Sequence, residues 1–330
     1  MEYFKLYANV LPVKGAKMYI ICDLQRNNYH YIPEGMYELL TKYADKTIEE
    51  TKTFYSNDEN NDIDQYIDFL IDKEYGLITN EPESFPSIDL KFELPEKINN
   101  AIIDSNFNSK HDFGSIFSQL EHLDCKYLEL RFYDVIRFDN LTNILNLTIN
   151  KRFKNISIYL KFYPEIKNDI DRFFSANSFG NIGGIYIHSS DDNKVDVIAL
   201  TDIYYSTVVL SSADCCGKID RKLFSINLPT YLEGLNFNTC LNKKISIDAL
   251  GNIKNCPSMI KSFGDMENTS LSEVINNEDF LKLWSVTKDQ IAVCKDCQFR
   301  YICTDCRAFV EDFYEKPFKC LYDPYLNVWN

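Results

Sequence analysis

The segment CKDCQFRYICTDCR, residues 294–307, places four cysteines within thirteen positions. The chain begins MEYFKLYANVLP, which lacks the basic and apolar regions of a secretory signal. We therefore expect a cytoplasmic protein, whose thiols stay reduced. Closely spaced cysteines in that compartment are typical of metal-binding or catalytic sites rather than of a disulfide framework.

Length and composition limit the other possibilities. The chain has 330 residues, of which 45% are hydrophobic, so two or three domains with substantial cores are expected. Its formal net charge of −14 argues against nucleic acid or an anionic membrane as a partner, because both require basic surfaces. No stretch approaches the roughly 18 unbroken apolar residues that span a bilayer.

The cysteines are unevenly distributed. Cys22 and Cys125 lie in apolar, strand-like segments and are predicted to be ordinary buried thiols. The other nine of the eleven follow residue 214, and no histidine lies among them. A zinc ribbon usually separates its two C-x2-C pairs by about 12–20 residues. Here only QFRYI separates them, which suits an iron–sulfur cluster better.

Two other interpretations of these cysteines stay open. All-thiolate ligation is also compatible with zinc. Thiols without any metal are the third alternative, although exposed thiols in such number would be prone to oxidation.

The complete spacing is more specific. Cys240 is followed by ten residues, Gly251, four residues and Cys256, then by C-x2-C-x5-C-x2-C and, after thirteen residues, by Cys320. This pattern resembles the SPASM domain, the auxiliary-cluster domain of peptide-modifying radical SAM enzymes. It departs from the family pattern at one place, since two residues rather than three separate Cys303 from Cys306.

The resemblance implies two [4Fe–4S] clusters and a ligand set for each. The positions that match the first cluster are Cys294, Cys297, Cys303 and Cys320. Those that match the second are Cys240, Cys256 and Cys306. The fourth ligand is predicted to be Cys216, because Gly217 allows a close backbone approach, with Cys215 as the alternative.

The catalytic motif of radical SAM enzymes is absent. In that family a C-x3-C-x2-C motif follows the first strand of a partial barrel. Residues 23–214 contain a single cysteine, Cys125, and the strand-like run YLELRF (127–132) lacks the family's Gly-Glu pair. This argues against SAM cleavage. No catalytic residue and no nucleotide-binding loop is predicted, and whether the chain is an enzyme stays open.

The middle of the chain is predicted to be α/β. Short β-branched and aromatic runs alternate with segments long enough for helices, which indicates parallel β/α units. The runs are SIDLKFEL (87–94), YLELRFYD (127–134), NISIYLKF (155–162), GGIYIHSS (183–190) and STVVLSS (206–212), with a helix at LTNILNLTI (141–149). The resemblance favours a partial (β/α) barrel, and a doubly wound sheet is the alternative.

The predicted domains are 1–84, 85–230 and 231–330. In the first, strand-like runs around a Pro–Gly turn and in NNYHYIP precede three helical patterns, one of them with a Thr47–Glu50 capping box. This order resembles a winged-helix peptide-recognition element, which binds an extended leader peptide as an added strand. If a peptide binds, the predicted contacts are Tyr29, Tyr31, Tyr66 and Phe69. Core packing explains these aromatic residues equally well.

Two stretches, ISIDALGNIKNCPSMIKSFG (245–264) and CKDCQFRYICTDCRAF (294–309), resemble the SPASM-domain maturases of "grasp-with-spasm" systems. The resemblance implies a role in making a ribosomally synthesised, post-translationally modified peptide. The partners would be the precursor peptide and an ATP-grasp ligase. Three hypotheses follow: an iron–sulfur accessory protein, a redox or radical peptide-modifying enzyme, and a zinc-stabilised peptide-binding protein.

Overall fold

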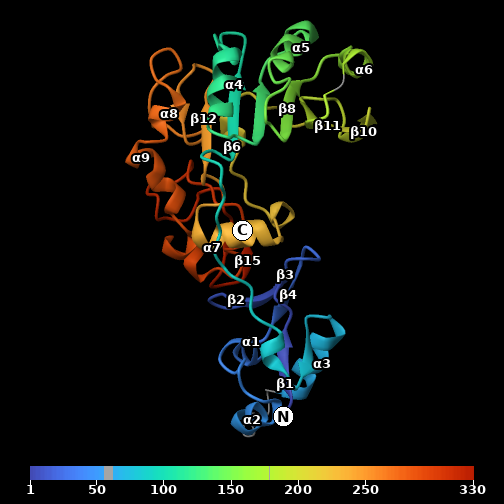
Figure 1. Cartoon of the computed structure of the whole chain (residues 1–330), viewed down its shortest axis with the longest axis vertical. Coiled ribbons are helices and arrows are strands. Elements are labelled where there is room, and N and C mark those ends of the chain that lie inside the picture. Colours follow the sequence, from blue (N-terminus) through green and yellow to red (C-terminus); the bar gives the residue numbers. More distant parts are fainter. Residues whose placement is uncertain (56–61, 178) are drawn as a thin grey trace.

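The structure, a computed structural model, describes residues 1–55, 62–177 and 179–330. The molecule is elongated (Figure 1). The N-terminal segment (residues 1–84) lies at one end and an eight-stranded sheet at the other. The cysteine-rich segment (residues 231–330) lies between them and also contributes two strands to the sheet.

The N-terminal segment contains the predicted strands and helices in the predicted order. Strands β2 (Val10–Lys14), β3 (Tyr19–Asp23) and β4 (Asn28–Ile32) form an antiparallel sheet. Helices α1 (Glu34–Thr41), α2 (Ile48–Tyr55) and α3 (Ile63–Asp72) follow. A separate antiparallel pair, β1 (Tyr3–Leu6) with β5 (Gly76–Thr79), was not predicted.

Sequence patterns explain the helices of this segment. Thr47 and Glu50 form the predicted capping box, in which the Thr47 N–H donates to Glu50 Oε2 at 2.8 Å and the Glu50 N–H to Thr47 Oγ1 at 3.2 Å. Ile63, Ile67 and Leu70 form the buried stripe of α3. The helices bury their apolar faces against β3, and together they make the core of the segment.

The central sheet has the order β10-β11-β9-β8-β7-β6-β12-β13. Its strands are β6 (Asn100–Ser105), β7 (Tyr127–Phe132), β8 (Asn155–Lys161), β9 (Ile182–His188), β10 (Lys194–Ile198), β11 (Thr201–Tyr205), β12 (Lys244–Ile247) and β13 (Ile253–Lys254). All neighbours pair in parallel except the outermost strand at each edge. The crossovers are α4 (Phe113–His122), α5 (Phe138–Asn146) and α6 (Ile166–Ala176). The predicted α/β class with parallel units is confirmed.

The two faces of the sheet differ. On β7, Leu128, Leu130 and Phe132 are buried in the core that also contains the apolar residues of the crossover helices. Glu129 and Arg131 alternate with them and point to the opposite face. The chain therefore packs one face with helices and gives the other face ionisable side chains.

Two predicted strands are wrong. Residues 87–94 are extended but pair with no described strand, and the first strand of the sheet is β6, which comes after them in the chain. Residues 206–212 are not a strand either. Backbone hydrogen bonds join Ser206 to Ile187 and Ser190, and Val208 to Ser189, but the strand itself is the preceding TDIYY, β11. Alternating side chains predict an extended backbone, but a strand also needs a neighbouring backbone, which local sequence does not specify.

Residues 85–94 instead connect the N-terminal segment to the sheet, and their carbonyl oxygens are bound by side chains. Asn236 Nδ2, on α7 (Leu228–Asn236), donates to the Leu90 carbonyl at 2.8 Å. The Lys243 ammonium group donates to the carbonyl oxygens of Leu94 and Glu96. Figure 1 shows this connection running along the cysteine-rich segment.

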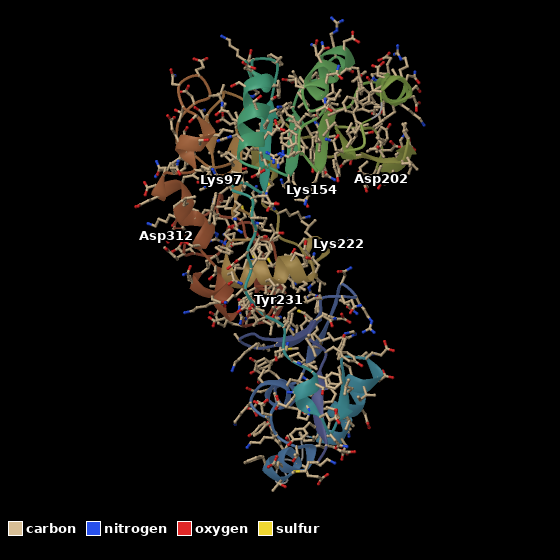
Figure 2. The ribbon with its side chains drawn as sticks, viewed as in Figure 1. Lys97, Lys154, Asp202, Lys222, Tyr231 and Asp312 are labelled. Carbon is tan, nitrogen blue, oxygen red and sulfur yellow. The ribbon has the colours of Figure 1, made fainter. Side chains whose placement is uncertain are left out.

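The N-terminal segment packs directly on the cysteine-rich segment. Val13, Ile20 and Cys22 share a buried cluster with Phe299 and Tyr231; Tyr231, on α7, is labelled in Figure 2. At the β2–β3 turn the Ala16 N–H donates to the Asp296 carbonyl at 2.7 Å. Gly15 fits there because a Cβ atom would lie 2.8 Å from the Gln298 nitrogen. The predicted burial of Cys22 and Cys125 is confirmed, at 0% and 1% exposed.

We expect Gly15→Ala to weaken this packing. The added methyl group would also lie 2.6 Å from the Met18 carbonyl, so backbone must move, at a cost of about 1–3 kcal/mol in the free energy of unfolding. Urea unfolding followed by circular dichroism measures the effect. Gly180→Ala is the matched control, because its added Cβ would meet no atom within 4 Å. Equal midpoints for both variants would contradict the prediction.

Candidate metal centres

The four cysteines predicted for the first cluster lie around one small cavity. Cys294, Cys297, Cys303 and Cys320 all line it. Cys294 begins a short 3-10 helix (Cys294–Asp296), and Cys320 precedes the hairpin of β14 (Tyr322–Asp323) and β15 (Val328–Trp329). Short turns thus bring together thiols that are up to 26 positions apart, which gives an all-sulfur donor set.

Burial strongly affects these thiols. It raises the pKa of Cys294 and of Cys297 to about 12, and it also raises the pKa of Cys303. Lys288 lines the same cavity, and its ammonium group donates to the Cys303 carbonyl. Burial opposes the charged form of Lys288, yet nearby Cys303, Asp305 and Cys294 raise its pKa overall. A buried cation therefore accompanies the thiols.

The cysteines predicted for the second cluster also lie near one another. A Cβ atom on Gly217, next to Cys216, would lie 2.8 Å from the Cys306 sulfur. Burial raises the pKa of Cys256 to about 11 and also raises that of Cys306. The negative charges of Cys240 and Cys216 raise the pKa of both thiols further.

Cys215 differs from Cys216 in its surroundings. It is exposed, and its thiol donates to the Val209 carbonyl at 3.5 Å. Cys216 has the neighbours expected of the fourth ligand, as Gly217 led us to predict, and the assignment itself stays a prediction.

A lysine also accompanies the second group. Lys244 begins β12, and its ammonium nitrogen lies 3.6 Å from the Cys240 sulfur. Burial opposes its charged form, but Cys240, Cys256, Glu129 and Cys216 raise its pKa overall. Because Glu129 belongs to β7, this group of thiols lies against the polar face of the sheet.

A buried ion pair holds the loops between the two groups. Arg307 is 1% exposed, and its Nε lies 2.9 Å from Asp305 Oδ1. Its Nη1 donates to the carbonyl oxygens of Phe313 and Glu315, both at 2.8 Å. Asp305 also accepts from Asn238 Nδ2 at 2.9 Å. These bonds replace the backbone ladders that this loop-rich region lacks.

No three His, Cys, Asp or Glu side chains in the described ranges converge closely enough to hold a single metal ion. Within the same ranges no helix has the length and apolar character needed to cross a bilayer.

Comparison with known proteins bears on the cysteine-rich segment. Residues 239–298 match SPASM, an iron–sulfur cluster-binding domain. The match includes Cys240, Cys256, Cys294 and Cys297 and ends before the last three cysteines. The resemblance found in the sequence is therefore confirmed for this domain, which covers less than half of the chain.

Other likenesses to known proteins are weak. No curated protein matches the chain in sequence. The crystal structure of Streptococcus suis SuiB bound to S-adenosylmethionine aligns with 96% of this chain and 99% of its own, at 10% identity and a TM-score of 0.40. SuiB bound to precursor peptide SuiA aligns equally, over 96% and 98% at the same identity and TM-score. Similarity at this level does not establish a common fold or function.

A row of side chains across the polar sheet face was not predicted. Asp104, Arg131, Tyr159, Tyr186 and Tyr204 are in register on five adjacent strands. The three tyrosine rings stack, with centroids 4.6 and 4.9 Å apart, and the Arg131 guanidinium lies 5.9 Å from the first ring. Burial raises the Asp104 pKa to about 6, against the opposing effect of Arg131. The alternation in YLELRF indicated one polar face, but only strand register creates the row.

The predicted peptide contacts do not form one surface. Tyr29 and Tyr31 lie on β4 and contact Phe299 of the cysteine-rich segment, with ring centroids at 5.4 and 6.2 Å. Tyr66 and Phe69 lie on α3 and pack against the core of the N-terminal segment. Their role in peptide binding stays a prediction.

Two histidines that could suggest chemistry have structural surroundings. His188 is buried, and its Nε2 lies 3.0 Å from the Phe132 carbonyl. His122 is exposed whereas Cys125 is buried, so they do not form a Cys–His pair.

Alkylation can test the ionisation of the thiols. Because alkylation needs the thiolate, and burial raises the pKa of Cys294 and Cys297 to about 12, their rates should keep rising above pH 9.5. A synthetic peptide CKDCQFRY should level off near pH 8.5–9. Mass spectrometry of metal-free, anaerobic protein measures both. Rates that level off together near pH 9 would contradict the burial of these thiols.

Proposed function

We propose that this chain is an iron–sulfur protein of peptide maturation that holds two [4Fe–4S] clusters and binds a ribosomally made precursor peptide. The observation that supports it best is the separation of eight cysteines into two groups, each with its own lysine. The match of residues 239–298 to an iron–sulfur cluster-binding domain supports the choice of cofactor.

The residues present fit such clusters. Cys294, Cys297, Cys303 and Cys320 would hold the first. Cys216, Cys240, Cys256 and Cys306 would hold the second. Both donor sets are all-sulfur, and a bound cluster would supply either fold stabilisation or one-electron transfer. Lys288 and Lys244 would offset the negative charge of the thiolates, which makes ionisation of buried sulfur less costly.

The remaining parts of the proposal divide the chain at residues 84 and 230. Residues 1–84 would act as a winged-helix peptide-recognition domain, residues 85–230 as a partial β/α barrel, and residues 231–330 as the SPASM-like domain. The bond formed in the precursor would be made by a partner ATP-grasp ligase. This partner rests on the resemblance of residues 245–264 and 294–309 to grasp-with-spasm maturases.

We further propose that the chain works without cleaving SAM. The first strand of the sheet is β6, and the loop after it, NFNSKHD (106–112), has no cysteine to hold a catalytic cluster. A redox or radical enzyme and a zinc-stabilised binding protein are the competing hypotheses. A SAM-cleavage assay under reducing conditions distinguishes a redox or radical enzyme from the proposed accessory protein, which would not cleave SAM.

Metal analysis of anaerobically purified protein tests the clusters. About eight iron and eight sulfide per chain, with absorption near 400 nm, are expected. Cys297→Ser and Cys256→Ser should each reduce the iron to about half, because each removes a ligand of a different cluster. Cys125→Ser is the matched control, since that thiol is buried in the sheet core, and it should retain the full content. About two zinc without sulfide would instead favour the zinc protein.

A further inference from the structure

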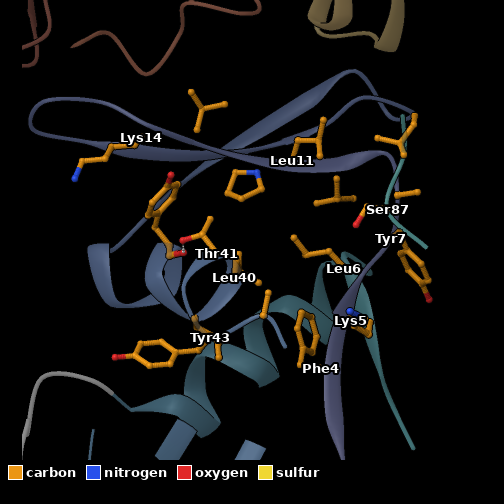
Figure 3. Close-up of a pocket in the computed structure, with 18 of the residues that line it drawn as sticks. Phe4, Lys5, Leu6, Tyr7, Leu11, Lys14, Leu40, Thr41, Tyr43 and Ser87 are labelled. Carbon is orange, nitrogen blue, oxygen red and sulfur yellow. Dashed lines mark hydrogen bonds between the residues drawn. The ribbon is translucent and has the colours of Figure 1, made fainter. Parts of the chain in front are cut away.

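A groove of about 450 Å³ lies where the N-terminal segment meets the cysteine-rich segment. β2 forms one side of it, and β1 and α1 form the other (Figure 3). Phe85, Ser87, Ile88 and Leu90 of the connection to the sheet also line it. Tyr231 and Leu235 of α7, with Arg300 and Tyr301, contribute from the cysteine-rich segment. Three separate parts of the chain therefore build this groove.

The charge of the groove is opposite to that of the protein. Across the chain, 49 Asp and Glu residues outnumber 35 Lys and Arg residues. No acidic residue lines the groove, whereas four basic residues do: Lys5, Lys14, Lys46 and Arg300. Most other lining residues are apolar or aromatic, including Phe4, Leu6, Leu40 and Ile88. The lining is thus complementary to a segment that carries apolar side chains and carboxylates.

Two of these cations are available to a ligand. Lys5 lies 3.8 Å from Asp45, and Arg300 lies 2.8 Å from Asp289 while it also donates to the Lys14 carbonyl. Lys14 and Lys46 are exposed and make no ion pair with any residue that the structure describes. Lys14 is the last residue of β2, and Lys46 lies two residues before α2 begins, so the two cations come from different parts of the lining.

The wall at 85–90 makes little use of its backbone groups, although the Leu90 carbonyl accepts from Asn236 Nδ2 and the Phe85 N–H donates to the Pro82 carbonyl. Among described residues, 86–97 make no backbone–backbone hydrogen bond, although SIDLKFEL (87–94) has the alternation of a strand. An extended, unpaired backbone next to a groove can accept a peptide as a new strand.

Strand β2, on another side of the groove, is less suited to pair with a peptide. The bonds from the Leu24 N–H to the Asn9 carbonyl and from the Gly15 N–H to the Met18 carbonyl set the β2–β3 register. The backbone of Pro12 consequently faces the free edge of β2, where it offers no N–H donor.

We propose that this groove binds an extended, acidic segment of the precursor peptide. The peptide backbone pairs with residues 87–90, and its carboxylates lie beside Lys14 and Lys46. The proposal rests on the proposed function, in which the chain binds a precursor peptide, and it adds where the peptide binds and which chemistry is recognised. Because the whole chain is acidic, non-specific attraction would select basic peptides instead.

The test selects from a displayed pool of random twelve-residue peptides on the immobilised full chain and titrates synthetic copies of the winners. We expect peptides rich in Asp, Glu and apolar residues. Lys14→Glu/Lys46→Glu should weaken their binding about tenfold or more. The matched control is Lys110→Glu/Lys154→Glu, which makes the same change in net charge at exposed lysines outside the groove. The control should bind like the parent chain.

Hydrogen exchange supplies the second measurement. Bound peptide should slow exchange at amides within 87–90, because pairing protects them. Unchanged binding by the Lys14→Glu/Lys46→Glu variant, or unchanged exchange at 87–90, would refute the groove as the binding site. Peptide binding by the chain would still hold in that case. Enrichment of basic peptides would overturn the charge preference. If no peptide were selected, the peptide-binding part of the proposed function would fail too, whereas the iron content would test the clusters independently.

Discussion

The balance of charge around buried sulfur is the constraint on which this structure depends. A thiol becomes a ligand only as a thiolate, and burial opposes that ionisation. Lys288 beside the first group of cysteines and Lys244 beside the second offset the cost. Arg307, paired with Asp305, holds the loops between the two groups. Few helices or strands run through this region, so side-chain bonds define much of its shape.

The cysteine-rich segment also joins the other parts of the molecule. Through β12 and β13 it extends the central sheet, and Lys244 brings the second group of thiols to the polar sheet face. Through Phe299 and Gln298, next to Cys297, it packs against the hairpin of the N-terminal segment. A structural change at the cysteines would therefore alter the groove that we propose for the peptide, because Arg300 and Tyr301 line it.

Predictions from the sequence were most successful where the signal was local. The Thr47–Glu50 capping box, the stripe of α3 and strands β7, β8 and β9 each depend on residues a few positions apart, and all are present. The predicted strand at 87–94 failed, although its alternation is as regular as that of β7. The difference is that β7 has neighbours on both sides, whereas 87–94 pairs with none of the described strands.

The sequence by itself indicated an iron–sulfur cluster-binding domain. The spacing of Cys240, Gly251, Cys256 and the run 294–306 identified the SPASM domain, because ligand spacing is a property of the chain. Only the tertiary structure decided which charges surround the thiols, which side chains form the Asp104–Tyr204 row and which surfaces build the groove. The row joins five strands, and the groove joins Lys14 to Arg300, 286 positions away. Their geometry follows from strand register and from packing between segments, which no local pattern encodes.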